Sequence, residues 1–379
     1  MRAVRLLLAT LAATAALAAL ALPAGAAERR VPFGFYGAMW DGPVTQLPVE
    51  LQEAEWDRMA QSGVESVRTV FSWALAQPQP DDAFGFAHTD PLVEWAAERG
   101  MELVPVLEVV PPWARLSPGS DTTRRGMAYA RFARALVERY GPAGTFWAER
   151  PELPRRPLRA WQVLNEPYFR SWRRGVAHAT NNWPRGYVRL LRPAYRAIKR
   201  VDPGAKVVLA GLSNESWKYL ARLYRAGARP YFDIVGQHPY VTNARRVIRA
   251  LRKIRRVMIK RRDRRKRVWI TELGWTATRG RLQNTLGGIE TTEKGVAGRL
   301  RKSYRRLAKL QRRHPRLGGR VHFYTWASSY EGGAPFNYSG LLQVRPGEDP
   351  APKPALSAYI AGARRDQGCV KTALGACEP

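Results

Sequence analysis

The sequence predicts an α/β protein of the (β/α)8 TIM barrel class, organised as a single catalytic domain. Two observations lead to this prediction. Short apolar segments rich in strand-forming residues alternate with longer segments whose apolar residues recur at helical spacing, which is typical of a parallel sheet. Eight such units follow one another in the chain, and eight strand–helix units close most simply into a barrel.

The expected strands are short and apolar. They cover residues 31–40, 64–70, 101–109, 158–164, 205–212, 232–238, 268–273 and 321–327. The fourth strand stops at Asn165-Glu166-Pro167, because proline has no N–H group to donate to a sheet. In a barrel of this class the carboxyl ends of the strands form the active face, so we expect the chemistry at those ends.

The expected helices lie between the strands, and a last short helix follows the eighth. They cover residues 49–62, 90–100, 121–140, 184–201, 214–226, 243–262, 291–313 and 354–363. The segment 243–262 is very basic, yet its apolar residues recur every three or four positions, which predicts that one face packs on the barrel. Its outward arginines form either a solvated surface or a dock for an anionic polymer.

The first residues have the pattern of a secretory signal peptide. Arg2 and Arg5 precede an apolar run, and small residues at 24–27 form a cleavage site. We therefore expect residues 1–27 to be removed, residues 28–365 to form the barrel domain and residues 366–379 to form a tail. The protein is expected to be secreted, monomeric and without a transmembrane anchor after cleavage. In an oxidising compartment Cys369 and Cys377 could close a small disulfide loop.

The chain has 63 Lys and Arg residues against 31 Asp and Glu, a formal net charge of +32. This charge reflects either a composition bias or attraction to an anionic partner such as an acidic polysaccharide or a wall polymer. Nucleic acid is not an expected partner, since no nucleic-acid module is recognisable. No phosphate-binding glycine loop, His/Cys metal cluster or Ser-His-Asp arrangement stands out, so we expect no metal and no cofactor.

Three strand ends carry carboxylates. Glu108 ends the third strand, where it either touches substrate or has a structural role, and it is not counted among the catalytic residues. Glu166 ends the fourth strand, and Glu272 lies at the end of the seventh, so the two should face each other across the barrel mouth. Glycosidic bond cleavage needs such a pair, one group to protonate the leaving oxygen and one to attack or to activate water.

At these residues the chain resembles the clan A glycoside hydrolases, above all families five and thirty-nine. The motifs are N-E-P after the fourth strand and I-T-E-L-G-W at the seventh, together with S-V-R-T-V-F-S-W, P-V-L-E-V-V-P-P-W-A and D-I-V-G-Q-H-P-Y. They occur in order along nearly the whole chain after the signal peptide. The resemblance implies retaining hydrolysis of O-glycosidic bonds in a poly- or oligosaccharide.

By the same resemblance, Glu166 is the general acid/base and Glu272 the nucleophile. Asn165 would bind the sugar hydroxyl beside the anomeric carbon, and Arg68 and Tyr240 would donate hydrogen bonds to Glu272. His238 would line this subsite, and Trp326 would form its floor. A nearby arginine also favours the ionised nucleophile on physical grounds, because it lowers a carboxyl pKa.

Two other functions remain open at this point. A transglycosylase would use the same residues but pass the glycosyl group to a sugar. A non-catalytic carbohydrate- or wall-binding barrel would keep the fold without the reaction.

Overall fold

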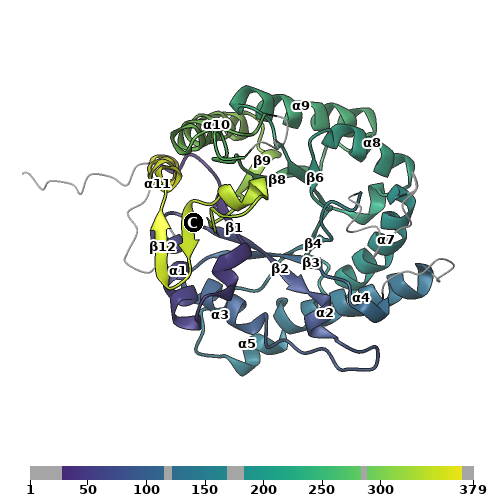
Figure 1. The fold of residues 1–379 in the computed structure, drawn as a ribbon. Coiled ribbons are helices and arrows are strands. Elements are labelled where there is room, and N and C mark those ends of the chain that lie inside the picture. Colours follow the sequence, from purple (N-terminus) through teal and green to yellow (C-terminus); the bar gives the residue numbers. More distant parts are fainter. Residues whose placement is uncertain (1–27, 115–121, 169–182, 283–287, 369–379) are drawn as a thin grey trace, which may run out of the picture.

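The computed structural model describes residues 28–114, 122–168, 183–282 and 288–368. Its main sheet is parallel throughout and curves into a closed barrel surrounded by helices (Figure 1). The strand order is β5-β4-β3-β2-β1-β9-β8-β7-β6, and an additional pairing of β5 with β7 completes the ring. The predicted (β/α)8 barrel is confirmed.

The barrel strands are short, as expected. They are β1 Tyr36–Trp40, β2 Ser66–Ser72, β3 Glu102–Glu108, β4 Ala160–Val163, β5 Lys206–Val208, β6 Leu212–Ser213, β7 Ile234–His238, β8 Arg267–Leu273 and β9 Leu317–Phe323. The predicted fifth strand, 205–212, is two pieces, β5 and β6, which both pair with β7. They occupy one position in the ring.

The eighth strand position differs from the prediction. It was expected at 321–327, but β9 spans Leu317–Phe323 and pairs with β8 from Leu317 onward. Glycines at 318 and 319 concealed the start of the strand, because glycine is a poor strand former. After Phe323 the chain leaves the barrel, and Ala327 and Ser328 form β10 of a second, three-stranded sheet.

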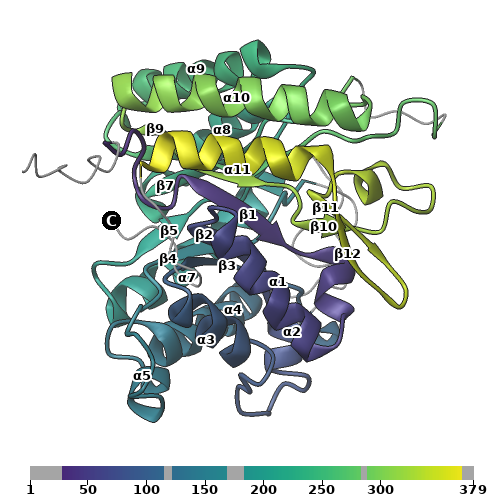
Figure 2. The same cartoon turned by 90° about the vertical axis from the view of Figure 1, so that its left-hand side faces the viewer.

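This second sheet was not predicted. It consists of β10 Ala327–Ser328, β11 Leu342–Arg345 and β12 Glu348–Pro352, with β10 parallel and β12 antiparallel to β11. Figure 2 shows it at the end of the barrel toward which β1 points. The loop after the eighth barrel strand therefore has a folded structure of its own at the active face.

The helices form the outer ring. They are α1 Val49–Gln61, α2 Trp73–Ala76, α3 Asp90–Glu98, α4 Thr122–Tyr140, α5 Thr145–Glu149, α7 Trp183–Val201, α8 Ser216–Arg225, α9 Ala244–Lys260, α10 Glu293–Arg313 and α11 Pro354–Gln367. Short 3-10 helices lie at Gly42–Gln46, Pro112–Ala114, Arg229–Tyr231 and Pro335–Tyr338. The short helices α2 and α5 were not predicted.

The basic helix α9 packs as its spacing predicts. Asn243 caps its first turn by accepting hydrogen bonds from two backbone amides, and Val247, Leu251, Ile254 and Met258 are fully buried. These residues stand three or four positions apart and so share one face. The arginines on the other faces are exposed or half-buried.

The core has two parts. The larger one fills the space between barrel and helices. The smaller one joins single residues of five strands: Val104, Ala160, Val208, Ile234 and Trp269. Val104 pairs in register with Arg68 of β2, so the two side chains point to the same face of the sheet.

Several predictions fall outside the described residues. The signal peptide and the pair Cys369 and Cys377 are among them, and they stay predictions. Among the residues that the structure describes, no helix combines the length and apolar character needed to cross a bilayer.

Candidate active site

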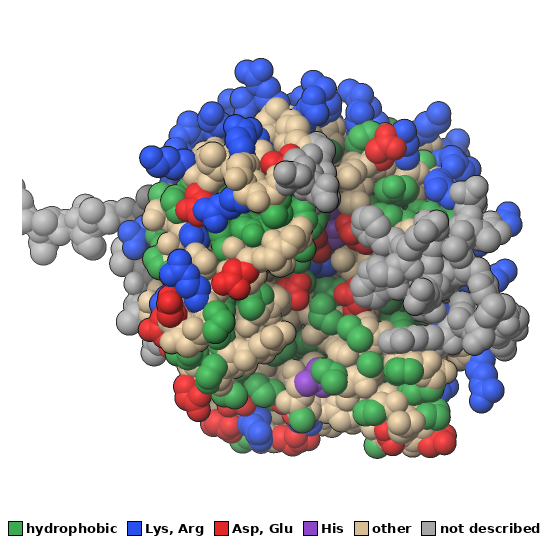
Figure 3. Space-filling view, in the orientation of Figure 1, with side chains coloured by type: hydrophobic (Ala, Val, Ile, Leu, Met, Phe, Trp, Pro, Cys, Tyr) green, Lys and Arg blue, Asp and Glu red, His purple; other side chains and the backbone are tan. Residues whose placement is uncertain are grey.

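Six of the seven predicted site residues meet at the carboxyl end of the barrel. Arg68 extends from β2, Asn165 and Glu166 follow β4, His238 ends β7 and Glu272 lies in β8. Tyr240 follows β7 and reaches the same place. This face is hollowed at its centre, where acidic and histidine side chains are visible (Figure 3).

Glu272 is surrounded by hydrogen-bond donors. Nη1 of Arg68 donates to its Oε1 at 2.8 Å, the hydroxyl of Tyr240 donates to its Oε2 at 2.6 Å, and Nδ1 of His238 lies 3.3 Å from Oε2. Burial disfavours the charged carboxylate, but the charges of His238 and Arg68 and the two hydrogen bonds outweigh it. The pKa of Glu272 is therefore below its usual value, and the group is ionised at neutral pH.

Glu166 stands just beyond β4 in an unusual backbone conformation. Its φ of 39° lies in the left-handed region, which residues other than glycine seldom adopt. Such a conformation costs about 1–3 kcal/mol and persists where surrounding structure imposes it, often at functional sites. Here Asn165 forms a parallel bridge with Gly211, and the backbone N–H of Glu166 donates to the Gly211 carbonyl at 3.3 Å.

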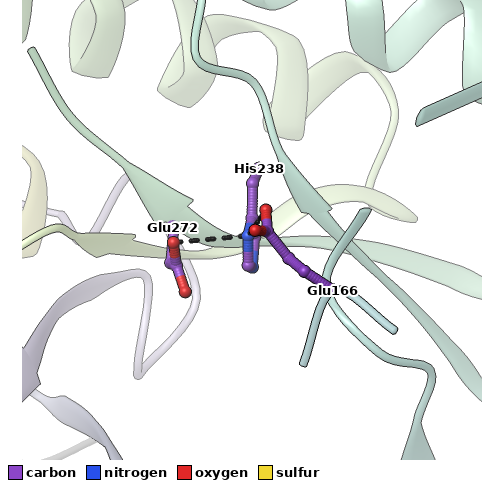
Figure 4. A group of neighbouring side chains, drawn as sticks. All are labelled: Glu166, His238 and Glu272. Atoms are coloured by element: carbon purple, nitrogen blue, oxygen red, sulfur yellow. Dashed lines mark hydrogen bonds and ion pairs between the residues drawn. The ribbon is translucent and has the colours of Figure 1, made fainter. Parts of the chain in front are cut away.

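His238 lies between the two glutamates (Figure 4). Its Nδ1 is 2.8 Å from Oε1 of Glu166, and it is also the nitrogen near Glu272. One oxygen of Glu166 and one of Glu272 lie within 4.8 Å of each other. The two carboxyl groups are thus close, and they share one imidazole nitrogen.

Gln162 is a site residue that the sequence interpretation missed. Its Oε1 accepts from Nε of Arg68 at 2.9 Å, and its Nε2 donates to the carbonyl of Leu164 at 2.9 Å. Nη2 of Arg68 donates to Oδ1 of Asn165 at 2.9 Å. Gln162 therefore fixes the guanidinium that holds Asn165 and Glu272. The signal was a glutamine inside the otherwise apolar strand A-W-Q-V-L.

The prediction that Trp326 forms the floor of the subsite is wrong. Its side chain is fully buried, and its indole N–H donates to Glu55 of α1 at 2.8 Å. The cause is the position of β9, which ends three residues before Trp326. The indole is therefore packed against α1 and is not exposed at the barrel mouth.

Tyr324 is the aromatic residue that this strand brings to the site. It directly follows β9 and is half-buried, and its ring meets Tyr240 edge to face with the centroids 6.5 Å apart. Its hydroxyl donates to Asp41 at 3.4 Å. Burial and then the negative charges of Asp41 and Glu272 raise the pKa of Tyr324 well above its usual value, so the hydroxyl keeps its proton.

Glu108 adds a further carboxyl group to the site. It ends β3, it is 5% exposed, and its Oε1 is buried without a hydrogen-bond partner among the described residues. Burial raises the pKa of Glu108 well above its usual value, an effect that Glu272, Asp41 and Glu166 strengthen and Arg68 opposes. A neutral carboxylic acid here can donate a hydrogen bond to a ligand.

We expect Glu108→Gln to change how stability depends on pH. The folded protein holds this proton more tightly than the unfolded chain, whose carboxyl pKa is near 4.5. The free energy of unfolding therefore falls as pH rises above that value, by up to ~1.4 kcal/mol per pH unit until the folded pKa is reached. Glutamine resembles the neutral acid and cannot ionise.

Chemical denaturation of wild type and variant at pH 4 and pH 7 checks this expectation. The variant should gain stability relative to wild type at pH 7 but not at pH 4. The exposed Glu138→Gln is the matched control and should show no such difference. An equal effect of Glu108→Gln at both pH values would contradict the assignment of a neutral Glu108.

Metal binding is the other chemistry that this geometry could support. Glu166, His238 and Glu272 offer two carboxylate oxygens and one imidazole nitrogen within 4.8 Å of one another. However, both oxygens of Glu272 already accept hydrogen bonds, one of them from the Arg68 guanidinium. A cation bound here would be repelled by that fixed charge, so the arrangement does not favour a metal ion.

No protein-family model and no curated protein matches the chain. Solved structures do match it. A family 39 glycoside hydrolase from the gut symbiont Bacteroides cellulosilyticus aligns with a TM-score of 0.64 and 17% identity over 89% of this chain and 64% of that one. The chain thus spans less than two thirds of the length of that protein.

Two other neighbours have similar scores. A family 39 β-xylosidase from Caulobacter crescentus aligns with a TM-score of 0.59 and 18% identity, covering 88% of this chain and 72% of that one. A β-glucosidase from Thermotoga maritima aligns with a TM-score of 0.61 and 12% identity, covering 91% of this chain and all of that one. The chain has the fold of the (β/α)8-barrel glycoside hydrolases. Its structural neighbours include members of family 39, one of the families that its motifs resemble.

Proposed function

We propose that the protein is a retaining glycoside hydrolase that cleaves β-linked sugars by double displacement. The observation that carries this proposal is the pair Glu166 and Glu272, whose oxygens approach within 4.8 Å. Retaining enzymes keep their two carboxyl groups about 5–5.5 Å apart, whereas inverting enzymes need about 6.5–9.5 Å to admit a water molecule.

In the first step Oε of Glu272 attacks the anomeric carbon and forms a glycosyl ester. The glycosidic C–O bond breaks, and Glu166 gives its proton to the leaving oxygen. In the second step Glu166 takes a proton from water, the water oxygen attacks the anomeric carbon, and the Glu272 carboxylate leaves. Atoms and protons balance, and Glu166 ends protonated as it began.

The neighbouring residues have distinct tasks in this scheme. Arg68 and Tyr240 keep Glu272 ionised and oriented, so the nucleophile is ready before the substrate binds. Asn165 accepts a hydrogen bond from Arg68, and in this scheme it binds the sugar hydroxyl beside the anomeric carbon. His238 contacts both carboxyl groups and adjusts its hydrogen bond as the charge moves from Glu272 to Glu166.

Mechanism-based labelling tests the proposal. The purified protein is incubated with 2-deoxy-2-fluoro β-glycosyl fluorides of xylose and glucose, the sugars named for two structural neighbours, and digested for mass spectrometry. We expect one glycosyl unit on the peptide that contains Glu272. Labelling of another residue, or binding of sugars with no labelling by any donor, would count against the proposal.

Gly211→Ala is expected to lower activity although it replaces neither Glu166 nor Glu272. A Cβ at this position would lie 2.0 Å from Nε2 of His238 and 2.9 Å from Oδ1 of Asn165, so the imidazole must move. A displacement of about 1 Å near the chemistry can cost ~10²-fold in rate, so kcat/KM on an aryl β-glycoside should fall by about that factor.

Gly298→Ala in α10 is the matched control, because nothing lies within 4 Å of the position that its added methyl group would take. It should keep wild-type activity. Near-wild-type turnover by a folded Gly211→Ala variant would show that the position of His238 does not matter.

We also propose that the protein is exported and that residues 1–27 are removed. Amino-terminal sequencing of the protein from the culture medium should begin after residue 27. Recovery of the intact amino terminus from the cells alone would contradict this.

A further inference from the structure

A second cavity lies at the opposite end of the barrel from the carboxylate pair. Its volume is about 530 Å³, within the ~300–1,000 Å³ typical of ligand sites. We call it the arginine cavity; it is lined by Arg252, Arg255, Arg256, Ile259, Arg313, His314, Pro315, Arg316 and Leu317. These residues come from the second half of α9, the end of α10, the short connection after it and the start of β9. A ligand there would leave the barrel mouth free.

The lining carries positive charge and no carboxylate. Within the part of the chain that the structure describes, none of its five arginines forms an ion pair with an acidic side chain. Arg255 is held in place by a hydrogen bond from its Nη1 to the carbonyl of Arg264 at 2.6 Å. Burial, followed by the charges of Arg316 and Arg264, lowers the pKa of Arg255. Like charges held together in this way are relieved by a bound anion.

The cavity also has an apolar side. Ile259 is 54% exposed, one of the few large apolar side chains so exposed in the described structure, and it lines the cavity together with Pro315 and Leu317. Apolar groups beside guanidinium groups match a sugar ring that carries a carboxylate. The C–H face of the ring packs on the aliphatic side chains, while the planar guanidinium binds the carboxylate through two hydrogen bonds.

Other anionic polymers fit less well. Proteins that bind single-stranded nucleic acid stack the bases on aromatic side chains, and the arginine cavity has no Phe, Tyr or Trp in its lining. Lys and Arg side chains also gather over α9 and α10 at the rim of the molecule (Figure 3). The full chain has a net charge of +32. An anionic polymer is therefore attracted to this basic surface before the polymer reaches the cavity.

We propose that the arginine cavity binds uronate units of an acidic polysaccharide and holds the protein on a polymer whose glycosidic bonds the barrel mouth cleaves. The choice of a sugar polymer rests on the proposed function. The binding itself does not depend on turnover, so the two can be tested separately.

The test measures binding of fluorescein-labelled β-1,4-linked tetramannuronate by anisotropy at 0.15 M salt, with neutral cellotetraose as competitor. The double variant Arg252→Gln/Arg256→Gln removes two lining charges one helical turn apart. Its matched control is Arg301→Gln/Arg305→Gln, which removes two exposed charges with the same spacing from α10, outside the cavity. We expect the Kd to rise at least ~10-fold in the cavity variant and less than ~3-fold in the control.

A third variant, Ile259→Asn, keeps the positive charge of the cavity and should weaken tetramannuronate binding several-fold. Equal losses in the cavity and control variants, no binding by wild type, or displacement by cellotetraose would overturn the proposal. Tighter binding of oligothymidylate or of phosphatidylglycerol vesicles would also overturn it, in favour of nucleic acid or membrane. All variants should hydrolyse an aryl β-glycoside as fast as wild type does. If no protein, wild type included, hydrolyses a glycoside while binding follows the expected pattern, the proposed function is wrong but the arginine cavity is still a uronate-binding site.

Discussion

Glu272→Gln is expected to lower kcat on an aryl β-glycoside by on the order of 10⁶-fold, as when a serine hydrolase loses its nucleophile. The amide is close in size to the carboxylate and can still pair with Tyr240, but it cannot form the glycosyl ester. Because the amide is neutral, it also no longer forms an ion pair with Arg68. The loss should therefore appear in kcat for every substrate, whatever its leaving group.

Two further measurements test whether the loss of activity comes from the missing nucleophile. Glu272→Gly in the presence of azide should regain turnover and give the glycosyl azide of inverted configuration, because the small anion attacks from the vacated side. The exposed Glu138→Gln should match wild type. A folded Glu272→Gln protein that keeps a tenth of the wild-type rate would rule out a covalent role for this residue.

Glu166→Gln is expected to lower kcat/KM by about 10²- to 10⁴-fold on glycosides with poor leaving groups. The amide cannot protonate the departing oxygen, and this matters most when the leaving group is a sugar or an alkyl alcohol. A dinitrophenol leaves without protonation, so on dinitrophenyl glycosides the first step should remain near the wild-type rate. Hydrolysis of the glycosyl enzyme would then become the slow step, because water lacks its general base.

Stopped-flow and steady-state kinetics with a leaving-group series can separate these effects. A burst of dinitrophenol followed by slow turnover is the expected pattern. A uniform loss of rate across the series would instead place Glu166 in substrate binding or in support of the fold.

Much of this site follows from local sequence. Asn165-Glu166-Pro167 after an apolar run, and Glu272 near the end of another, are strand ends, and a parallel barrel brings strand ends together. Arg68 and Tyr240 were expected to donate to Glu272, and both donate to it in the structure. The meeting of the strand ends follows from the barrel, whereas the expected roles of Arg68 and Tyr240 came from the resemblance to the clan A glycoside hydrolases.

The site residues that the sequence could not predict depend on the register of the barrel strands. Moving the eighth strand by four residues exchanges Trp326 for Tyr324 at its end, and the glycines at 318 and 319 gave no strand signal to correct the error. Gln162 was missed because its partners, Arg68 and the Leu164 carbonyl, become neighbours only after β2 and β4 take their places in the barrel.

The stereochemistry of the first product tests the central proposal most directly. Proton NMR of an aryl β-glycoside, recorded from the first seconds of hydrolysis, distinguishes the two anomers of the released sugar before they interconvert. Double displacement through Glu272 predicts that the β-anomer appears first. Initial formation of the α-anomer would mean a single displacement by water, and Glu272 would then be a base rather than a nucleophile.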